Sequence, residues 1–480
     1  MRKKAMQTTL TSRVAYNTIV QFVGKGITTV IGVITLGLLT RYLDVSGYGE
    51  YTIVFAFLGC FAVAADFGLC SIAVRDIAQT PDQKEKIFGN IFTLRIILGV
   101  GLLALAPLVA YFIPNYNHDI KAGIGICAFA SFFILLNQTL LAIFQVNLRM
   151  EKAVIIDTAG RAMILVLVVL CIKEQLGFLS IIAAHGLGNL ATFILSLFLA
   201  RPFIKIRLRF DRVYLRHLIP QVLPLGAVAV LGIVYSKIDQ IILSLFWSSW
   251  HVGIYGAPYK ILEILVSLPA MFVGSVLPII SMYSASRDSR FFESLQRAFD
   301  FLALMALPTV FGVLMVAPTI IRVFAGREFA PSTPLLRILI LAVGLMFFGT
   351  LAGSTIVAAG LQKRLVKIYV ISTVSNIVLN LLLIPIYSFY AAAVITVLTE
   401  AWACSAAYVI VWRHLGWRPR LDRLSRATLA ALVMSLIVLL LRGENLAVQV
   451  AVGGGVYFAV LFLTGAINRE MMRTLLGRVD

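Results

Sequence analysis

The stretch QVLPLGAVAVLGIVYSKIDQIILSLF (residues 221–246) contains only two charged side chains, Lys237 and Asp239. It is long enough to cross a bilayer, because a spanning helix needs roughly 20 mostly apolar residues. The rest of the chain has the same character: of its 480 residues, 60% are hydrophobic and 13% are charged. Soluble domains are about 45–50% apolar and about 25% charged. The sequence therefore predicts an all-α polytopic membrane protein.

Windows of about 20 residues predict about fourteen transmembrane helices. A misread junction would leave twelve or thirteen. The predicted spans are residues 14–40, 47–73, 88–113, 121–146, 153–172, 177–200, 221–246, 254–284, 298–324, 334–360, 364–384, 389–412, 426–442 and 446–467.

The connectors between these spans alternate in charge. One set is rich in Lys and Arg and includes RDIAQTPDQKEK, RPFIKIRLRFDRVYLRH and WRHLGWRPRLDRLSR, whereas the other set, with FIPNYNHDI and WSSWHVGIYG, has only isolated cations. The positive-inside rule places the basic set and both termini in the cytoplasm. The formal net charge of +19 is thus interpreted as a signal for membrane orientation rather than for nucleic-acid binding.

A weak internal repeat relates two parts of the chain. VSGYGEYTIV (45–54) opens the second span and HVGIYGAPYK (251–260) opens the eighth, while the longest basic connector follows the sixth span. Parallel six-helix halves with a substrate site between them are a common transporter plan. We therefore predict an N-lobe at residues 1–216, a C-lobe at 217–416 and two further spans with a tail at 417–480.

Charged residues inside the spans are the candidates for function, because a charge at mid-bilayer costs roughly 2.5–3.5 kcal/mol on insertion scales and must face protein or a wet cavity. Asp157 and Arg161 are four residues apart and share a helical face, which favours a structural ion pair. The other charged residues of the spans are Lys25, Asp66, Arg95, Lys237, Asp239, Lys260, Glu263, Arg337 and Glu400.

Spacing separates the remaining candidates. Lys260 and Glu263 are three residues apart and also share a face, whereas Lys237 and Asp239 point to opposite sides of their helix and cannot pair. Lys25 lies between two glycines near the middle of the first span, with no acidic residue within a turn. An unpaired cation there is the strongest indication of function, with a distant structural partner as the alternative.

Other polar residues of the spans have simpler interpretations. Arg95 lies near the cytoplasmic end of its span and can extend its side chain to the interface. Asn376 and Asn380 share a helical face and are expected to form hydrogen bonds between helices.

The motifs of enzymes and cofactor sites do not occur in the sequence. It has no P-loop, no G-x-S-x-G and no H-E-x-x-H, and its five cysteines show no metal-ligand spacing. We therefore expect no enzyme activity, no metal and no cofactor. Uphill transport would need an ion gradient, the membrane potential or removal of the product.

Several stretches resemble the polysaccharide-transporter (Wzx-type) flippases, which belong to the superfamily of multidrug, oligosaccharidyl-lipid and polysaccharide exporters. One is NTIVQFVGKGITTVIGVITLGLLTRYLDVSGYGEYTIVFAF (17–57). Others are DFGLCSIAVRDIA (66–78), SKIDQIILSLFWSSWHVGIYGAPYKILE (236–263) and NIVLNLLLIPIYSFYAAAVITVLTE (376–400). The resemblance covers essentially the whole chain.

This resemblance implies a V-shaped alternating-access transporter of two six-helix lobes plus two C-terminal helices. Such proteins move a polyprenyl-(pyro)phosphate-linked oligosaccharide from the cytoplasmic to the outer leaflet of the plasma (inner) membrane, for O-antigen and similar cell-surface polysaccharides. The partners implied are the lipid-linked glycan, membrane lipids, a possible H⁺ or Na⁺ coupling ion and glycan-assembly enzymes.

The resemblance also implies which residues meet the substrate. Cationic residues on spans one and eight line the cavity of similar flippases, and the matching positions are Lys25 and Lys260. Lys237 and Arg95 are second choices. The expected supporting or coupling residues are Asp239, Glu263, Asp66, Arg161, Asp157 and Glu400.

Three other functions stay open at this point. An ion-coupled multidrug exporter belongs to the same superfamily but favours an acidic cavity, whereas the intramembrane cations here slightly outnumber the acids. A membrane-embedded glycan polymerase or ligase needs larger outer loops than these short connectors. A scaffold for glycan assembly is compatible with transport, because basic cytoplasmic loops can bind anionic lipid or partner enzymes.

Overall fold

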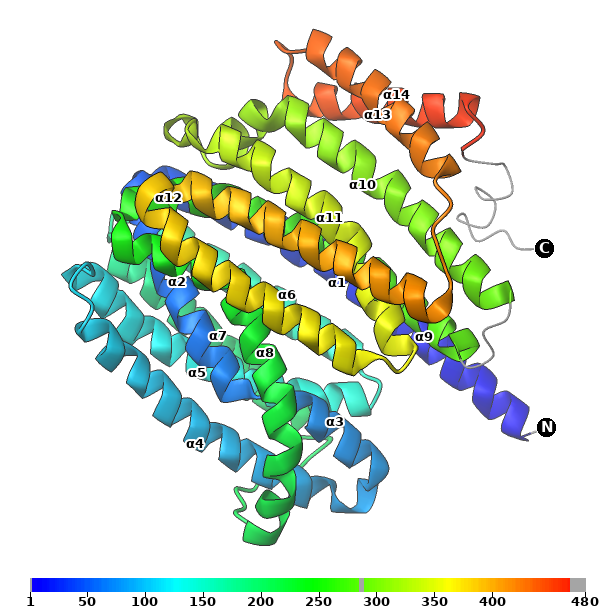
Figure 1. Cartoon of the computed structure of the whole chain (residues 1–480). Helices are drawn as coiled ribbons and strands as arrows, with labels where there is room; N and C mark the ends of the chain where they lie inside the picture. Colours follow the sequence, from blue (N-terminus) through cyan, green and yellow to red (C-terminus); the bar gives the residue numbers. More distant parts are fainter. Residues whose placement is uncertain (1, 285–288, 467–480) are drawn as a thin grey trace. The chain divides into compact units, whose positions relative to one another are not determined.

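The computed structural model describes residues 2–284 and 289–466 of the chain, and within these ranges all regular structure is helical (Figure 1). The elements are α1 (Arg2–Tyr42), α2 (Asp44–Asp66), α3 (Leu69–Gln79), η1 (Pro81–Gln83), α4 (Lys84–Tyr111), α5 (His118–Val146), α6 (Met150–Lys173), α7 (Phe178–Ala200), α8 (Arg212–Phe246), α9 (Ser249–Ser284), α10 (Ser289–Phe324), η2 (Arg327–Phe329), α11 (Ser332–Ala358), α12 (Gln362–Leu415), α13 (Asp422–Leu440) and α14 (Leu446–Leu463).

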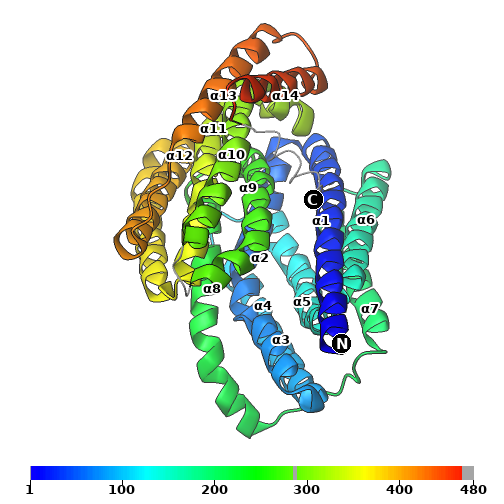
Figure 2. The ribbon, with the colours of Figure 1, turned by 90° about the vertical axis from the view of Figure 1, so that its right-hand side faces the viewer.

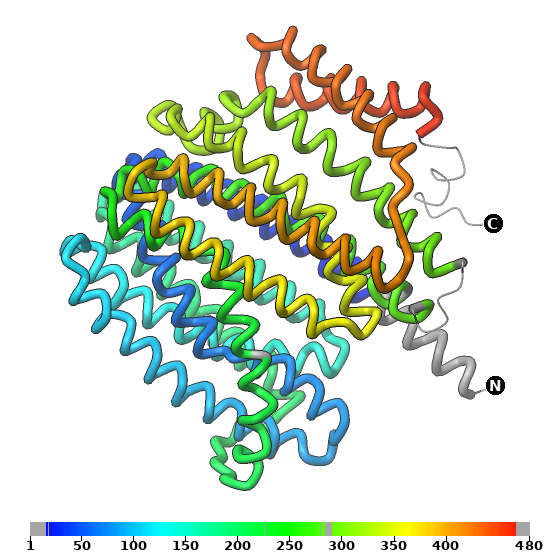
Figure 3. Tube along the Cα trace, viewed as in Figure 1, coloured from blue at the N-terminus to red at the C-terminus, as the bar shows by residue number. Residues whose placement is uncertain are grey.

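The number of spans agrees with the prediction once α12 is read as two helices. Thirteen helical segments of the described chain are long and apolar enough to cross a bilayer. The longest, α12, has 54 residues and a non-helical Ser388 at φ 54°, ψ −139°. The chain folds back at Ser388 (Figure 3), so that Asn376 Nδ2 donates to Thr399 Oγ1 at 3.5 Å. The prediction of an all-α membrane protein with about fourteen spans is confirmed.

The second predicted span, 47–73, is broken into α2 and α3. The break lies at Phe67 and Gly68, whose φ angles of 44° and 73° are both in the left-handed region. Glycine adopts this conformation without a steric penalty. The Asp66 carboxylate accepts the Gly68 N–H at 3.3 Å, so the break is stabilised by the acidic side chain that precedes it.

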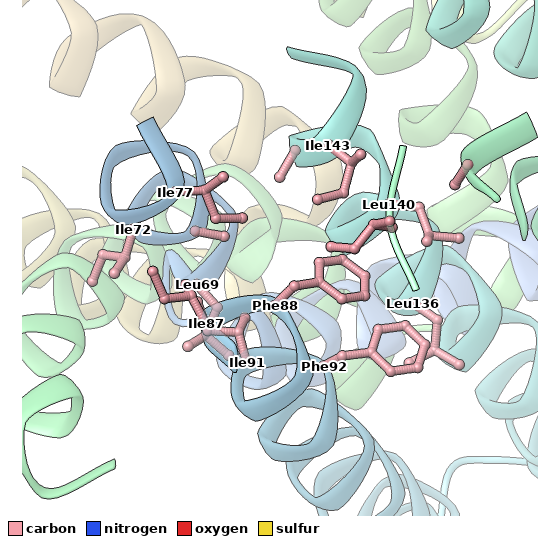
Figure 4. Close-up of a cluster of buried hydrophobic side chains, with 14 of the residues drawn as sticks. Leu69, Ile72, Ile77, Ile87, Phe88, Ile91, Phe92, Leu136, Leu140 and Ile143 are labelled. Carbon is pink, nitrogen blue, oxygen red and sulfur yellow. The ribbon is translucent and has the colours of Figure 1, made fainter. Parts of the chain in front are cut away.

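The chain forms two compact units, residues 1–253 and 254–480. In the first, α2 packs against α1, α4, α5 and α8, while α5 packs against α7. Its core contains Leu69, Phe88, Phe92 and Leu140 (Figure 4). In the second, α11 packs between α10 and α12, and α13 and α14 pack against α10. The lobe boundaries at residues 216 and 416 stay predictions.

The basic connector before α8 is attached to α4. The Lys86 ammonium lies 2.7 Å from the Asp211 carboxylate, and Asn90 Oδ1 accepts the Asp211 N–H at 2.6 Å. Gly89 leaves room for the carbonyl of Arg207. The hydrogen bond from Lys86, with the N–H groups at the start of α8, lowers the pKa of Asp211 from its ordinary value. This connector is therefore an ordered segment that fixes the start of α8.

Two glycines let α2 and the start of α9 approach so closely that their main chains are in contact. A Cβ on Gly49 would collide with the carbonyl of Ser249, and a Cβ on Gly253 would collide with the carbonyl of Val45. Both contacts are with main-chain atoms, which cannot rotate away. The register between these two segments therefore requires a hydrogen atom in place of each side chain.

Replacement of either glycine should destabilise the protein. We expect Gly49→Ala and Gly253→Ala each to cost about 1–3 kcal/mol, the usual penalty of overpacking. The matched control is Gly59→Ala on α2, where an added Cβ meets nothing within 4 Å and should gain up to about 1 kcal/mol from helix propensity. Thermal unfolding in detergent measures all three. An equal effect of the three substitutions would contradict the packing described.

Candidate functional site

Lys25 lies on α1, which packs mainly along α6 (Figure 2). The strip of α1 that contacts α6 is narrow. Gly24 leaves room for the Val154 side chain, and a Cβ on Gly32 would lie 4.0 Å from the Arg161 guanidinium. Near the start of the strip, Asn17 Nδ2 donates to the carbonyl of Leu148 at 3.1 Å. Much of the surface of α1 is therefore left uncovered within its own unit.

The uncovered surface of α1 has two different sides. Ile19, Val23, Val30 and Ile34 are 48–62% exposed and form an apolar side suited to lipid. Because a helix turns about 100° per residue, Lys25 lies roughly opposite this side.

Polar groups accompany Lys25 on its own side. Gln21 and Thr29 lie one turn before and one turn after it, and Thr29 Oγ1 donates to the Lys25 carbonyl at 2.7 Å. An added Cβ on the adjacent Gly26 would meet nothing within 4 Å. Within the side chains that the structure describes, no ion pair or hydrogen bond reaches the Lys25 ammonium. Phe22, which is 41% exposed, lies on the same side, so this side is polar only in part.

The depth of Lys25 is compatible with the expectation. Within the described residues, the apolar part of α1 includes Ile19–Tyr42, so Lys25 lies at least about 9 Å inside the span at 1.5 Å per residue. At this depth an ammonium in contact with lipid would be costly.

Lys260 forms the ion pair that its spacing predicted. Its Nζ lies 2.8 Å from Glu263 Oε2 on α9, with side chains that are 53% and 30% exposed. The carboxylate neutralises part of the lysine charge and limits its rotamers.

On α8, Lys237 and Asp239 lie in different surroundings, as their two-residue spacing predicts. Asp239 is 3% exposed, and its carboxylate accepts the N–H of Gln240 at 2.7 Å. Lys237 is half-buried. The Asp239 side chain is thus enclosed, whereas the Lys237 side chain is only partly covered.

Arg95 is fully buried rather than extended toward the interface, so the expectation that it snorkels is wrong. Its guanidinium forms an ion pair with Asp66 and donates to the carbonyl of Leu135 at 2.9 Å and to Thr139 Oγ1 at 2.7 Å. These contacts join α2, α4 and α5 next to the break at Phe67. The arrangement describes a structural strut, and Asp66 is its counter-ion.

The other predicted polar residues lie on single helices or within the α12 hairpin. Arg161 Nε lies 3.2 Å from Asp157 Oδ1, which confirms the predicted pair. Asn380 Nδ2 donates to Asn376 Oδ1 at 3.0 Å, and Asn376 bonds across the hairpin as expected. Glu400, on the second arm of α12, is half-buried.

The polar residues that accompany Lys25 were not predicted from the sequence. Gln21 and Thr29 are each four residues from it, and this spacing was the available signal. Their importance becomes visible only when the opposite side of α1 is found to be apolar and exposed.

Two known protein families match parts of this chain. The family described as "Polysaccharide biosynthesis protein" matches residues 14–284, more than half of the chain, and the MatE family matches residues 224–382. The chain belongs to the polysaccharide biosynthesis protein family.

Two named relatives are similar over most of their length. The "Probable low-salt glycan biosynthesis flippase Agl15" of Haloferax volcanii is 23% identical over 88% of this chain and 89% of its own. The "Putative O-antigen transporter" of Shigella flexneri is 22% identical over 79% of this chain and 93% of its own.

Solved structures share the fold. The "Lipid II flippase MurJ, inward closed conformation" has a TM-score of 0.78 at 16% identity and covers 93% of this chain and 98% of that one. An inward-facing MATE multidrug resistance transporter has a TM-score of 0.66 at 14% identity and covers 83% of this chain and 98% of that one. The fold is therefore that of flippases and multidrug exporters alike.

Substitution of Arg95 tests whether this residue is a structural strut or a ligand of the substrate. We expect Arg95→Met to cost about 3–5 kcal/mol in stability, because it leaves the partly buried Asp66 carboxylate without its partner. Adding Asp66→Leu should recover most of the loss. The exposed pair provides the control, since Arg161→Met should cost less than about 1 kcal/mol.

Thermal unfolding of the detergent-solubilised variants measures these differences. A stable Arg95→Met variant that has lost transport would contradict the structural role and return Arg95 to the substrate ligands.

Proposed function

We propose that this chain is a flippase that moves a polyprenyl-(pyro)phosphate-linked oligosaccharide from the cytoplasmic to the outer leaflet by alternating access, for cell-surface polysaccharide biosynthesis. Membership of the polysaccharide biosynthesis family supports this function. So do relatives whose names describe a glycan biosynthesis flippase and an O-antigen transporter. In this proposal the protein is a transporter rather than an enzyme.

The position of Lys25 is the observation that carries the proposal. It lies on an exposed and partly polar side of α1, opposite an apolar exposed side. A lysine in a site of low dielectric constant is a compact cation for a phosphate, and it needs no bidentate geometry. A phosphate-bearing lipid carrier would supply the counter-charge that this ammonium lacks in the described structure.

The other charged residues rank below Lys25 as contacts of the lipid carrier in this proposal. Lys260 is a further cationic contact for the anionic carrier, with Glu263 holding its side chain. Lys237 is a second choice, with Asp239 in a supporting role. We keep Arg95 out of the phosphate ligands because its donors are committed to α2 and α5.

The membrane context of the proposal follows from the charges of the connectors. The chain is a multi-pass membrane protein, and we propose that both termini lie in the cytoplasm and that the membrane is the plasma (inner) membrane. H⁺ or Na⁺ is a possible coupling ion, and glycan-assembly enzymes are possible partners of the basic loops.

A multidrug exporter is the second candidate, because the MatE family matches residues 224–382. Such exporters share the fold, so fold alone does not choose between the two functions. The cation on α1 favours an anionic substrate over a cationic drug. A drug-dependent ion flux would favour the exporter.

Transport in proteoliposomes tests the proposal and the site together. We expect native protein to translocate a polyprenyl-pyrophosphate oligosaccharide between leaflets. Lys25→Ala should lower the rate by at least about tenfold, because a charge-assisted contact is worth roughly 1.5–3 kcal/mol. Lys25→Arg should keep part of the activity. The matched control is Lys173→Ala, at the exposed end of α6.

The outcomes separate the function from the site. Full transport by Lys25→Ala would leave the flippase in place and remove Lys25 from its site. A lack of transport by the native protein, together with a drug-stimulated ion flux, would replace the flippase by the exporter.

Orientation is tested by single cysteines in a variant whose five native cysteines are alanine. His118→Cys, at the start of α5, should react with a membrane-impermeant maleimide added to intact cells, whereas Arg201→Cys should react only after permeabilisation. Both side chains are exposed in the structure. The reverse labelling pattern would invert the proposed topology.

A further inference from the structure

A cavity of about 370 Å³ lies within the second unit, where α10 ends and α11 begins. It is far along the chain from the residues proposed to meet the transported lipid. Arg322, in the last turn of α10, and Arg327, in η2, line it together with Thr333 in the first turn of α11. Two arginines and a threonine thus line one space.

The chain around this cavity is held in place. Gly326 has a φ of 102°, and its N–H donates to the Ile321 carbonyl at 3.1 Å, which ends α10 and turns the chain back. Phe329 is fully buried, and Ser332 Oγ donates to the carbonyl of Ile254 at 2.7 Å. The segment that carries Arg327 and Thr333 is therefore anchored on both sides.

The electrostatics of the cavity favour an anion. No acidic residue lines it, and Glu328, next to Arg327 in sequence, is exposed outside the lining. Neither guanidinium group has an ion-pair or hydrogen-bond partner within the part of the chain that the structure describes. The positive end of the α11 dipole adds to their field.

We propose that this cavity binds a phosphate oxyanion that carries a small organic group. Guanidinium forks match the geometry of phosphate oxygens. Pro318, Ile321 and Ala330 provide an apolar part of the wall that suits a glycerol-like substituent. The source is a phospholipid headgroup or a soluble phosphate ester. The site does not depend on the proposed flippase function.

Isothermal titration calorimetry of the purified full chain in neutral detergent tests this site. The probes are inorganic phosphate, glycerol 3-phosphate and dihexanoyl phosphatidylglycerol, at constant ionic strength. We expect the native protein to bind at least one of the two esters more tightly than inorganic phosphate. Binding of phosphatidylglycerol alone identifies a lipid source, and binding of both esters identifies a soluble ester as sufficient.

Variants assign the binding to the cavity. The double variant R322Q/R327Q should bind at least about tenfold more weakly, because it removes two charge-assisted contacts, while R322K and R327K should keep part of the affinity. Arg442→Gln, an exposed arginine in the α13–α14 turn, is the matched control and should change nothing. Transport activity is not the readout, so failure of the flippase proposal would leave these results unaffected.

Two results would overturn the proposal. One is that none of the three probes binds the native protein at millimolar concentration. The other is equal affinity of the native protein and of R322Q/R327Q with an unchanged thermal transition. If the double variant shows no thermal unfolding transition, the single variants R322Q and R327Q are compared with the native protein instead. Equal affinity with an unchanged thermal transition would again overturn the proposal.

Discussion

The constraint on which this structure depends is that lipid offers no hydrogen-bond partners to the main chain. Every peptide group inside the bilayer must be satisfied within the protein, and a continuous helix achieves this within one segment. The helix breaks that do occur have local compensation. Gly68 donates to the Asp66 carboxylate at the break after α2. In the hairpin of α12, a hydrogen bond from Asn376 to Thr399 joins the two arms.

The same constraint explains the arrangement of the intramembrane charges. Asp157 with Arg161 and Lys260 with Glu263 neutralise each other within a helical turn. Arg95 forms an ion pair with Asp66 on another helix. Lys25 differs from these, because it is exposed on a partly polar side of α1. A charge that the described protein does not neutralise is where an anionic ligand contributes most, and this difference makes Lys25 the leading candidate for substrate contact.

The fold is shared by flippases and multidrug exporters, so it restricts the function without choosing it. The choice rests on the family to which the chain belongs and on the sign of the charge on α1. The arginine-lined cavity at the end of α10 is a separate feature. It shows that cationic sites in this chain are not confined to the residues that the resemblance to flippases implies.

The sequence by itself determined the fold class, the number and approximate limits of the spans and the local ion pairs. These features depend on hydropathy over about 20 residues and on spacings of three or four within one helix, both of which are local. Only the tertiary structure decided that Arg95 is a strut, that Gly49 and Gly253 permit close backbone contact, and that Arg322 and Arg327 share a cavity. These depend on which helices lie side by side, and hydropathy carries little information about that choice because most faces of these helices are equally apolar.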